Sequence, residues 1–317
     1  MKIINNTFLA IILLFLSLSC DDILEEDITN DNVQISFPKE GTVIEGNTVQ
    51  FTWQSIDGAD DYRVQVITSN QILEVDSLMS TNTFVYTLNP GSYQWRIRGE
   101  NFAYETTYTF PVNFSVETSD DLSNQNVSLL TPSIDFYTNN ANIICTWNEL
   151  SNVSSYSFEL IKNLSGEQTV FKETGISSNS LTIDADVFDE DAEYIWKVKA
   201  INETSETQFS QRSLFLDREI PNQPALASPE DQDTTTTTVT FNWTNGVDSG
   251  NIKSSITNTI EIASDVNFNS IIHSANTENN TVQYTFTSTG TYYWRIKAID
   301  AAGNESDYSI VRSIIVE

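Results

Sequence analysis

The six tryptophans of this 317-residue chain fall into two series that recur at nearly constant spacing. The first series contains Trp53, Trp147 and Trp243, and the second contains Trp95, Trp196 and Trp294. Spacings are 94 and 96 residues in the first series, and 101 and 98 residues in the second. Each member of the second series lies in a Tyr-x-Trp-basic-aliphatic-basic motif. A period of this length, present three times, predicts three copies of one domain.

Apolar and polar residues alternate around these tryptophans. Val49, Phe51 and Trp53 alternate with two polar residues, and the same alternation precedes Trp147 and Trp243. A period of two is typical of a β-strand with one buried face and one solvated face. It places all six tryptophans in domain cores. Short strands separated by turn signals, in a unit of this size, predict a sandwich of two packed sheets.

The first repeat resembles a fibronectin type III domain. The residues that carry the resemblance are Trp53, the segment 57–62 ending in Tyr62, the turn 88–93 ending in Tyr93, and the strand motif 95–98. The family fold implies that the Tyr two places before the later Trp forms a tyrosine corner, with its hydroxyl bonded back to the main chain. The corner residues would be Tyr93, Tyr194 and Tyr292. The resemblance covers nearly all of 33–317 and implies an all-β chain of three tandem immunoglobulin-like domains of the fibronectin type III kind.

The third repeat departs most from the pattern. The interval from its first Trp to the matching position of the next strand is 15 residues, against nine in the other repeats. The extra residues lie between Asn245 and Thr257, and Asn258 stands where Tyr62 and Tyr156 stand.

The N-terminus predicts a lipoprotein signal peptide. Phe8 to Leu18 is an uncharged apolar run, too short to cross a hydrocarbon core of about 30 Å. The run ends at Ser17-Leu18-Ser19-Cys20, which resembles the lipobox of bacterial lipoproteins. The resemblance implies acylation of Cys20, and the multiple acyl chains of such proteins would give stable anchoring. An ordinary signal peptide with a chance Cys is the alternative.

These patterns predict domain boundaries along the chain. We expect a signal peptide at 1–19, a lipidated Cys and acidic disordered tether at 20–32, and sandwich domains at 33–117, 126–217 and 222–317. The segment 118–125 reads as a polar linker and 218–224 as a stiffer one with two prolines.

The charge of the chain excludes one class of partner. The formal net charge is −29, and phosphate binding needs clustered Lys and Arg, so we expect no nucleic acid as a partner. The acidic residues after Cys20 resemble the surface-export signal of some outer-membrane lipoproteins. We therefore expect a cell-envelope protein anchored in the outer membrane through its N-terminal lipid and exposed at the surface.

No residue pattern predicts catalysis. His273 is the only histidine, and Cys145 occupies a core-facing position that favours a buried, inert thiol. The carboxylate pairs lie in expected loops of small sandwiches, which rarely provide a catalytic cleft. We therefore expect no enzyme activity, no cofactor and no metal site. A structural calcium site is the alternative, with the segment from Asp300 to Glu305 as its place.

Two groups of residues are candidates for binding. Arg96 and Arg98 point outward on the strand of the second Trp, as do the equivalent basic residues of the other repeats. They either form a platform for an acidic glycan or a protein, or pair with acidic residues of the neighbouring strand, such as Glu261. Phe102 and Tyr104 stand in the loop that follows, where they either bind a ligand or fold back on their own domain.

These features predict a non-catalytic surface lipoprotein whose β-sandwich domains bind a glycan or a protein, or serve adhesion. The alternative is an accessory or spacer subunit of an outer-membrane protein assembly.

Overall fold

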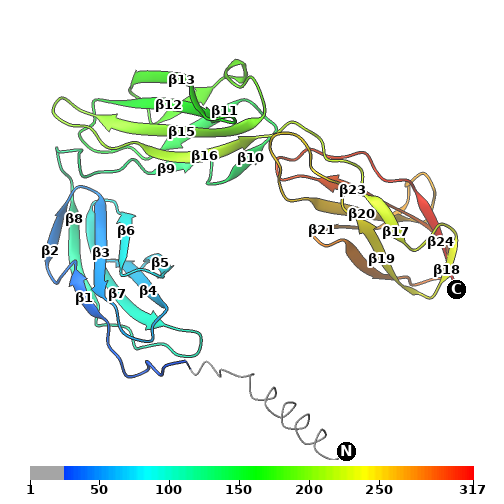
Figure 1. Cartoon of the computed structure of the whole chain (residues 1–317), viewed down its shortest axis with the longest axis horizontal. Helices are drawn as coiled ribbons and strands as arrows, with labels where there is room; N and C mark the ends of the chain where they lie inside the picture. The colour runs from blue at the N-terminus through cyan, green and yellow to red at the C-terminus, as the bar shows by residue number, and fades with distance from the viewer. Residues whose placement is uncertain (1–24) are drawn as a thin grey trace, which may run out of the picture. The chain divides into compact units, whose positions relative to one another are not determined.

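A computed structural model describes residues 25–317 and shows three β-sandwich domains in succession, which confirms the predicted all-β fold (Figure 1). The predictions for the signal peptide and for Cys20 fall outside the described residues.

The strands of the three domains are as follows. The first domain contains β1 (Gln34–Phe37), β2 (Thr42–Glu45), β3 (Thr48–Gln54), β4 (Asp61–Thr68), β5 (Leu73–Met79), β6 (Thr83–Thr87), β7 (Gly91–Glu100) and β8 (Val112–Glu117). The second contains β9 (Leu129–Thr131), β10 (Phe136–Thr138), β11 (Ile143–Trp147), β12 (Ser155–Asn163), β13 (Glu167–Ile176), β14 (Ser180–Ile183), the 3-10 helix η1 (Ala185–Val187), β15 (Ala192–Ile201) and β16 (Ser210–Leu216). The third contains β17 (Ala225–Ser228), β18 (Asp233–Thr235), β19 (Thr238–Thr244), β20 (Thr257–Ala263), β21 (Ile271–Thr277), β22 (Thr281–Thr285), β23 (Gly290–Ile299) and β24 (Arg312–Val316).

All three domains share one topology. The first domain pairs a three-stranded sheet, in the order β1-β3-β6, with a five-stranded sheet, in the order β2-β8-β7-β4-β5. The other two domains repeat both orders strand for strand. Within each domain only the pairing of the second and last strands is parallel, as in β2 with β8. The chain therefore carries tandem fibronectin type III-like sandwiches, as the repeat predicts.

The predicted tryptophans join the two sheets of each domain. In the first domain the ring of Trp95 on β7 lies 5.0 Å from that of Phe51 on β3, edge to face. Trp294 and Phe241 repeat this contact at 5.0 Å in the third domain. All six tryptophans are buried, because the alternation along their strands turns them inward.

The tyrosine corners form as the resemblance implies. The hydroxyl of Tyr93 donates to the carbonyl of Asn89 at 2.8 Å, and that of Tyr194 to Glu190 at 2.8 Å. Tyr292 repeats the bond to Ser288 at 3.1 Å. Each bond fixes the turn before the Trp strand to the strand itself.

The segments before the first two domains differ from the prediction. The sequence predicts a disordered tether up to residue 32, yet Ile28 is fully buried and the main-chain oxygen of Glu26 accepts a bond from Asn101 at 2.9 Å. Leu122, in the predicted polar linker, is also fully buried, in the core of the second domain. One apolar residue in each acidic segment is enough to hold it on the domain.

The chain forms two compact units. The first ends at Ser119 and contains the first domain, and the second, Asp120–Glu317, contains the other two. Within residues 25–317, no helix has the length and apolarity needed to cross a membrane.

The tyrosine corner of the second domain should contribute measurably to stability. Tyr194→Phe removes the donor to the main-chain carbonyl of Glu190, and we expect a loss of about 0.5–1.5 kcal/mol in the free energy of unfolding. Hydrogen exchange followed by mass spectrometry would show faster exchange of β15 peptides and unchanged exchange in the first domain. Tyr137→Phe is the control, because the Tyr137 ring stacks on Phe215 and, within residues 25–317, its hydroxyl has no hydrogen-bond partner. Equal effects of the two substitutions would contradict the assignment.

Candidate functional site

The outward basic residues of the first domain are already paired. Arg98 contacts Glu100 at 2.8 Å and Glu105 at 2.7 Å. Arg96 donates two hydrogen bonds to the side-chain oxygen of Gln65, at 2.9 and 2.7 Å. Both guanidinium groups also lie over the ring of Tyr108, at 4.4 and 4.9 Å from its centroid. The charge of Arg98 is therefore neutralised within the domain, and Arg96 uses donors on Gln65 and lies over the ring of Tyr108.

Three of the four equivalent residues of the other domains, Lys199, Arg295 and Lys297, are paired in the same way. Lys199 contacts Glu206 at 2.7 Å, and Arg295 contacts Glu261 at 2.7 Å. Lys297 contacts Glu305 at 2.6 Å. The structure thus favours pairing inside each domain over a platform for an acidic ligand, which leaves Arg96 and Arg98 as positioning residues of their own sheet.

Phe102 stands at the tip of the loop after β7. Its side chain is 94 % exposed, and that of Tyr104 is 39 % exposed. The side-chain oxygen of Asn101 accepts hydrogen bonds from the main-chain nitrogens of Ala103 and Tyr104, at 3.1 and 2.8 Å. These bonds close the loop into a tight turn, and the turn holds Phe102 away from its own domain. The adjoining hollow, lined by Glu100 to Glu105, has a volume of about 230 Å³.

Sequence reasoning missed a second exposed aromatic in the same connection. Phe110 is 95 % exposed and lies just before β8. Its neighbour Thr109 donates from its main chain to Ile97 at 2.9 Å. Because Thr109 is bonded to β7, the next residue, Phe110, faces away from that strand. The sequence signal was the apolar residue itself in a polar connection.

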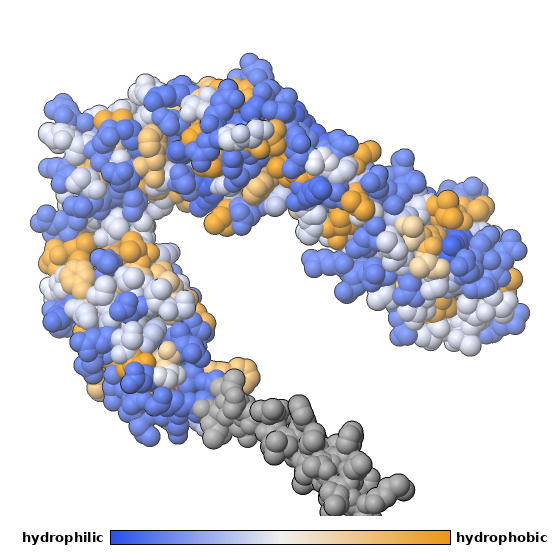
Figure 2. Space-filling view, viewed as in Figure 1, coloured by the Kyte–Doolittle hydropathy of each residue, from blue (hydrophilic) through white to orange (hydrophobic). Residues whose placement is uncertain are grey.

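A second feature is an apolar hollow on the second domain. Its volume is about 510 Å³, and its lining includes Leu130, Phe136 and Ile144. Leu130 and Ile144 are among the exposed large hydrophobic residues. Figure 2 shows that, on the face drawn, hydrophobic residues lie in small patches within a mostly hydrophilic surface.

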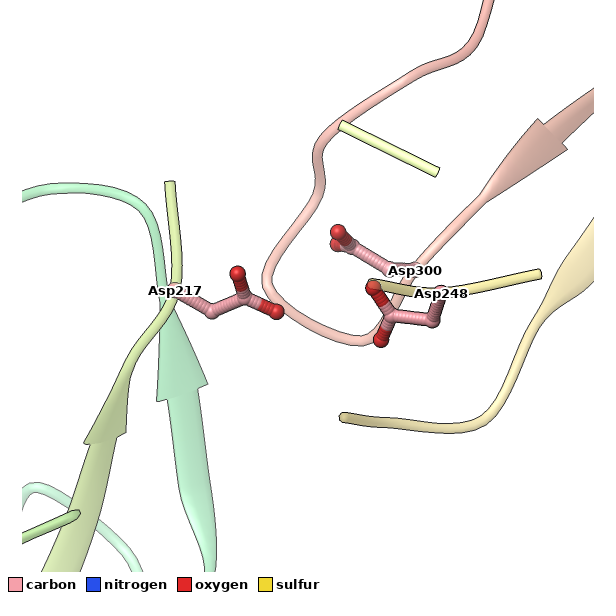
Figure 3. A group of neighbouring side chains, drawn as sticks. All are labelled: Asp217, Asp248 and Asp300. Carbon is pink, nitrogen blue, oxygen red and sulfur yellow. The ribbon is translucent and has the colours of Figure 1, made fainter. Parts of the chain in front are cut away.

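The third feature is a cluster of buried carboxylates where the second and third domains meet. Asp217, Asp248 and Asp300 are 1 %, 7 % and 5 % exposed. Each offers a carboxylate oxygen within 4.8 Å of the others. Figure 3 shows the three side chains pointing toward one another. These three residues are called the junction cluster below.

Three connections bring the junction cluster together. Asp217 follows β16 directly and Asp300 follows β23 directly, whereas Asp248 lies in the long connection between β19 and β20. Asp300 accepts two bonds from Asn304, both at 2.8 Å, and Asp248 accepts one from the main-chain nitrogen of Ser254 at 2.6 Å. Asp217 accepts one from the main-chain nitrogen of Glu219 at 3.1 Å.

The junction cluster is short of positive charge. Burial is the largest cause that raises the pKa of Asp217, to about 6; the bond from Glu219 lowers this pKa, and the negative charges of Asp248, Asp300 and Asp191 raise it further. Within residues 25–317, no Lys or Arg forms an ion pair with the three carboxylates. Oxygen ligands of this kind suit a hard divalent cation.

The sequence located only part of this cluster. Asp300 was in the segment considered for calcium, but Glu305 at the other end of that segment pairs with Lys297 instead. Asp217 and Asp248 were not considered. The signal for Asp248 was the extra length of the third repeat, because the six additional residues include it.

Comparisons with known proteins add little to this picture. No protein-family profile matches the chain, and no curated protein sequence matches it. Among solved structures, three fibronectin domains of chicken CNTN1 (FN1–FN3) share 16 % identity, with 90 % of this chain and 98 % of that chain covered and a TM-score of 0.46. The fibronectin(III)-like modules of Clostridium thermocellum CbhA share 13 % identity, with 59 % and 94 % covered and a TM-score of 0.23. The fold assignment rests on the strand order and tyrosine corners described above.

The thiol of Cys145 should be unreactive in the folded protein. Cys145 is fully buried, and burial raises the pKa of its thiol to about 12. We expect no reaction of a Cys20→Ser chain with a thiol-specific chromogenic reagent at neutral pH, and one thiol per chain after unfolding in guanidinium. Rapid modification of the native chain would contradict the burial of Cys145.

Proposed function

We propose that this chain is a non-catalytic, lipid-anchored protein of the bacterial outer surface, and that its first domain binds a protein partner through the Phe102 loop. The observation that carries the proposal is the exposed phenyl ring of Phe102, held clear of its own domain.

The Phe102 loop has the properties of a binding anchor. An exposed aromatic side chain gains free energy when a partner covers it, and aromatic residues dominate the energetics of many interfaces. The bonds from Ala103 and Tyr104 to Asn101 fix the loop before binding, so little conformational entropy is lost on association. Tyr104 adds a second aromatic ring with a polar end.

The contacts of this loop favour a protein over a glycan. The hollow beside Phe102, about 230 Å³, is below the range of about 300–1,000 Å³ usual for small-molecule sites. The basic residues that would attract an acidic glycan are bound to Glu100, Glu105 and Gln65. A protruding phenyl ring instead suits an apolar pocket on the surface of a partner.

The proposed anchor is Cys20. The apolar run before it and the lipobox-like segment 17–20 support cleavage and acylation, and the acidic residues that follow support export to the surface of an outer membrane.

A second candidate function is that of a spacer or accessory subunit in an outer-membrane assembly. The repeated use of outward charges within each domain favours it, because paired residues such as Lys199 and Arg295 leave fewer groups free for a ligand.

Substitution of the loop aromatic should weaken binding. We expect Phe102→Ala to raise the dissociation constant about 30-fold, equivalent to about 2 kcal/mol. The measurement is saturable binding of a soluble Cys20→Ala chain to envelope vesicles from cells that lack this protein. Phe110→Ala is the matched control, because Phe110 is equally exposed but lies outside the turn closed by Asn101.

Treatment of the vesicles separates the two partner classes. Loss of binding after protease, but not after periodate, supports a protein partner. Loss of binding after periodate, but not after protease, would instead identify a glycan as the partner. Unchanged binding by the Phe102→Ala chain refutes the loop as the site.

The anchor has an independent test. In cells of the source organism, we expect replacement of residues 1–20 by a signal peptide with an ordinary cleavage site to shift the chain from the membrane fraction to the soluble fraction, because the acyl chains supply the membrane affinity. Mass spectrometry of the purified wild-type chain should find an N-terminal acylated Cys20. A wild-type chain with a free Cys20 thiol would exclude lipidation and leave the loop proposal standing.

A further inference from the structure

We propose that the junction cluster binds one calcium ion, which joins the second and third domains through Asp217, Asp248 and Asp300. The proposal is independent of the function proposed above.

Two carboxylate oxygens of the cluster lack partners. Oδ2 of Asp217 and Oδ1 of Asp248 are buried and, within the part of the chain that the structure describes, accept no hydrogen bond. Both side chains are more than nine-tenths buried. Each carboxylate thus has one bonded oxygen and one buried oxygen that has lost its water, and the loss of hydration disfavours the charged form. A cation placed between the oxygens offsets this loss and the mutual repulsion of the three charges.

The repeats themselves show that the third domain is different at this place. Asn101 and Asn202 occupy the position of Asp300 in the first and second domains, six residues after the Trp of the motif. Each uses its amide nitrogen to donate to the lead-in segment of its own domain, Asn101 to Glu26 at 2.9 Å and Asn202 to Asp120 at 2.8 Å. In the first two domains a neutral amide donor therefore attaches the lead-in segment to the domain.

The third domain replaces that donor by an acceptor. Asp300 cannot donate when ionised, and the bond to the main-chain oxygen of Asp217 comes instead from Asn304, at 2.9 Å. The longer connection after β19 then adds Asp248 to the same place. Two separate changes from the common pattern thus bring negative charge to one buried place. The first two domains hold the same place with a neutral asparagine, so hydrogen bonding does not explain the added charge.

The geometry favours calcium among the common cations. Calcium binds oxygen at about 2.3–2.6 Å, so two of its ligands lie at most about 5 Å apart, and the 4.8 Å limit of the cluster fits within that. Magnesium demands near-ideal octahedral geometry and usually keeps several waters, so a buried site of protein carboxylates suits it less. Zinc prefers nitrogen and sulfur ligands, and the cluster contains only carboxylates.

Such an ion would couple two domains. Asp217 directly follows the last strand of the second domain, whereas Asp248 and Asp300 belong to connections of the third. Hydrogen bonds already cross between these domains, from Asn139 to Asn304 at 3.2 Å, from Asn304 to the main-chain oxygen of Asp217 at 2.9 Å, and from Asn251 to Asp191 at 3.3 Å. An ion held by both domains would restrict the motion of the intervening segment.

Calorimetric titration of the full Cys20→Ala chain, freed of metal by chelation, tests the proposal. We expect one calcium ion per chain, and a rise in the melting temperature on calcium addition. Asp300→Asn restores the residue of the other repeats, so it is compatible with folding, and it should weaken calcium binding at least ~10-fold. Asp307→Asn is the matched control, because it removes the same charge from an exposed position of the same domain.

A second readout follows the junction directly. Arg218 lies beside Asp217 and is partly exposed, so trypsin has a cleavage site within the segment that joins the domains. We expect calcium to slow cleavage after Arg218 in the wild-type and Asp307→Asn chains, and to have no effect in the Asp300→Asn chain. Mass spectrometry of the fragments identifies the site.

Several results would overturn the proposal. These are the absence of a calcium-dependent change in the wild-type chain, tighter binding of magnesium than of calcium, and full calcium binding by the Asp300→Asn chain.

Discussion

The aromatic contact between the two sheets is the interaction on which the other features depend. The tryptophan of β7 or β23 makes it in the first and third domains, and Trp147 of β11 makes it with Tyr156 of β12 in the second. Trp95 meets Phe51 across the first core, and Trp294 meets Phe241 across the third. Because the tryptophan side faces inward, the alternate residues of the same strand face outward, and these are the paired basic residues. The residue that directly follows this strand is Asn101, Asn202 or Asp300. Core, surface pairing and domain junction thus follow from the register of a single strand.

The sequence predicted the features that repeat and missed those that occur once. Three copies of the Trp motif located the domains and their tyrosine corners, because buried aromatic residues tolerate little variation in position. Burial of Ile28 and Leu122 could not be predicted, since each is a single apolar residue in a segment whose composition is typical of disorder. The junction cluster was missed for a different reason. Asp217, Asp248 and Asp300 lie far apart in the sequence, and they come together only where the third domain packs against the end of the second.

The same comparison separates the candidate sites. The basic residues were binding candidates because they recur in all three repeats. Their recurrence instead reflects ion pairing on the outer face of the five-stranded sheet, as Arg98 and Arg295 show. Phe102 and the junction cluster are not common to the three repeats. In a chain of similar domains, a function specific to one domain is expected where its residues differ from those of the other copies.

The bonds from Asn101 and Asn202 to the preceding main chain also define where the protein divides into parts. Each lead-in segment is attached to the domain that follows it, through Glu26 in one case and Asp120 in the other. The division between the two compact units, at Ser119 and Asp120, lies immediately ahead of the second of these segments. A recombination or duplication event that kept a folding unit whole would thus break the chain upstream of the acidic segment. The acidic segment travels with the sandwich as its N-terminal part, and an evolutionary module of this protein is longer than its strands alone.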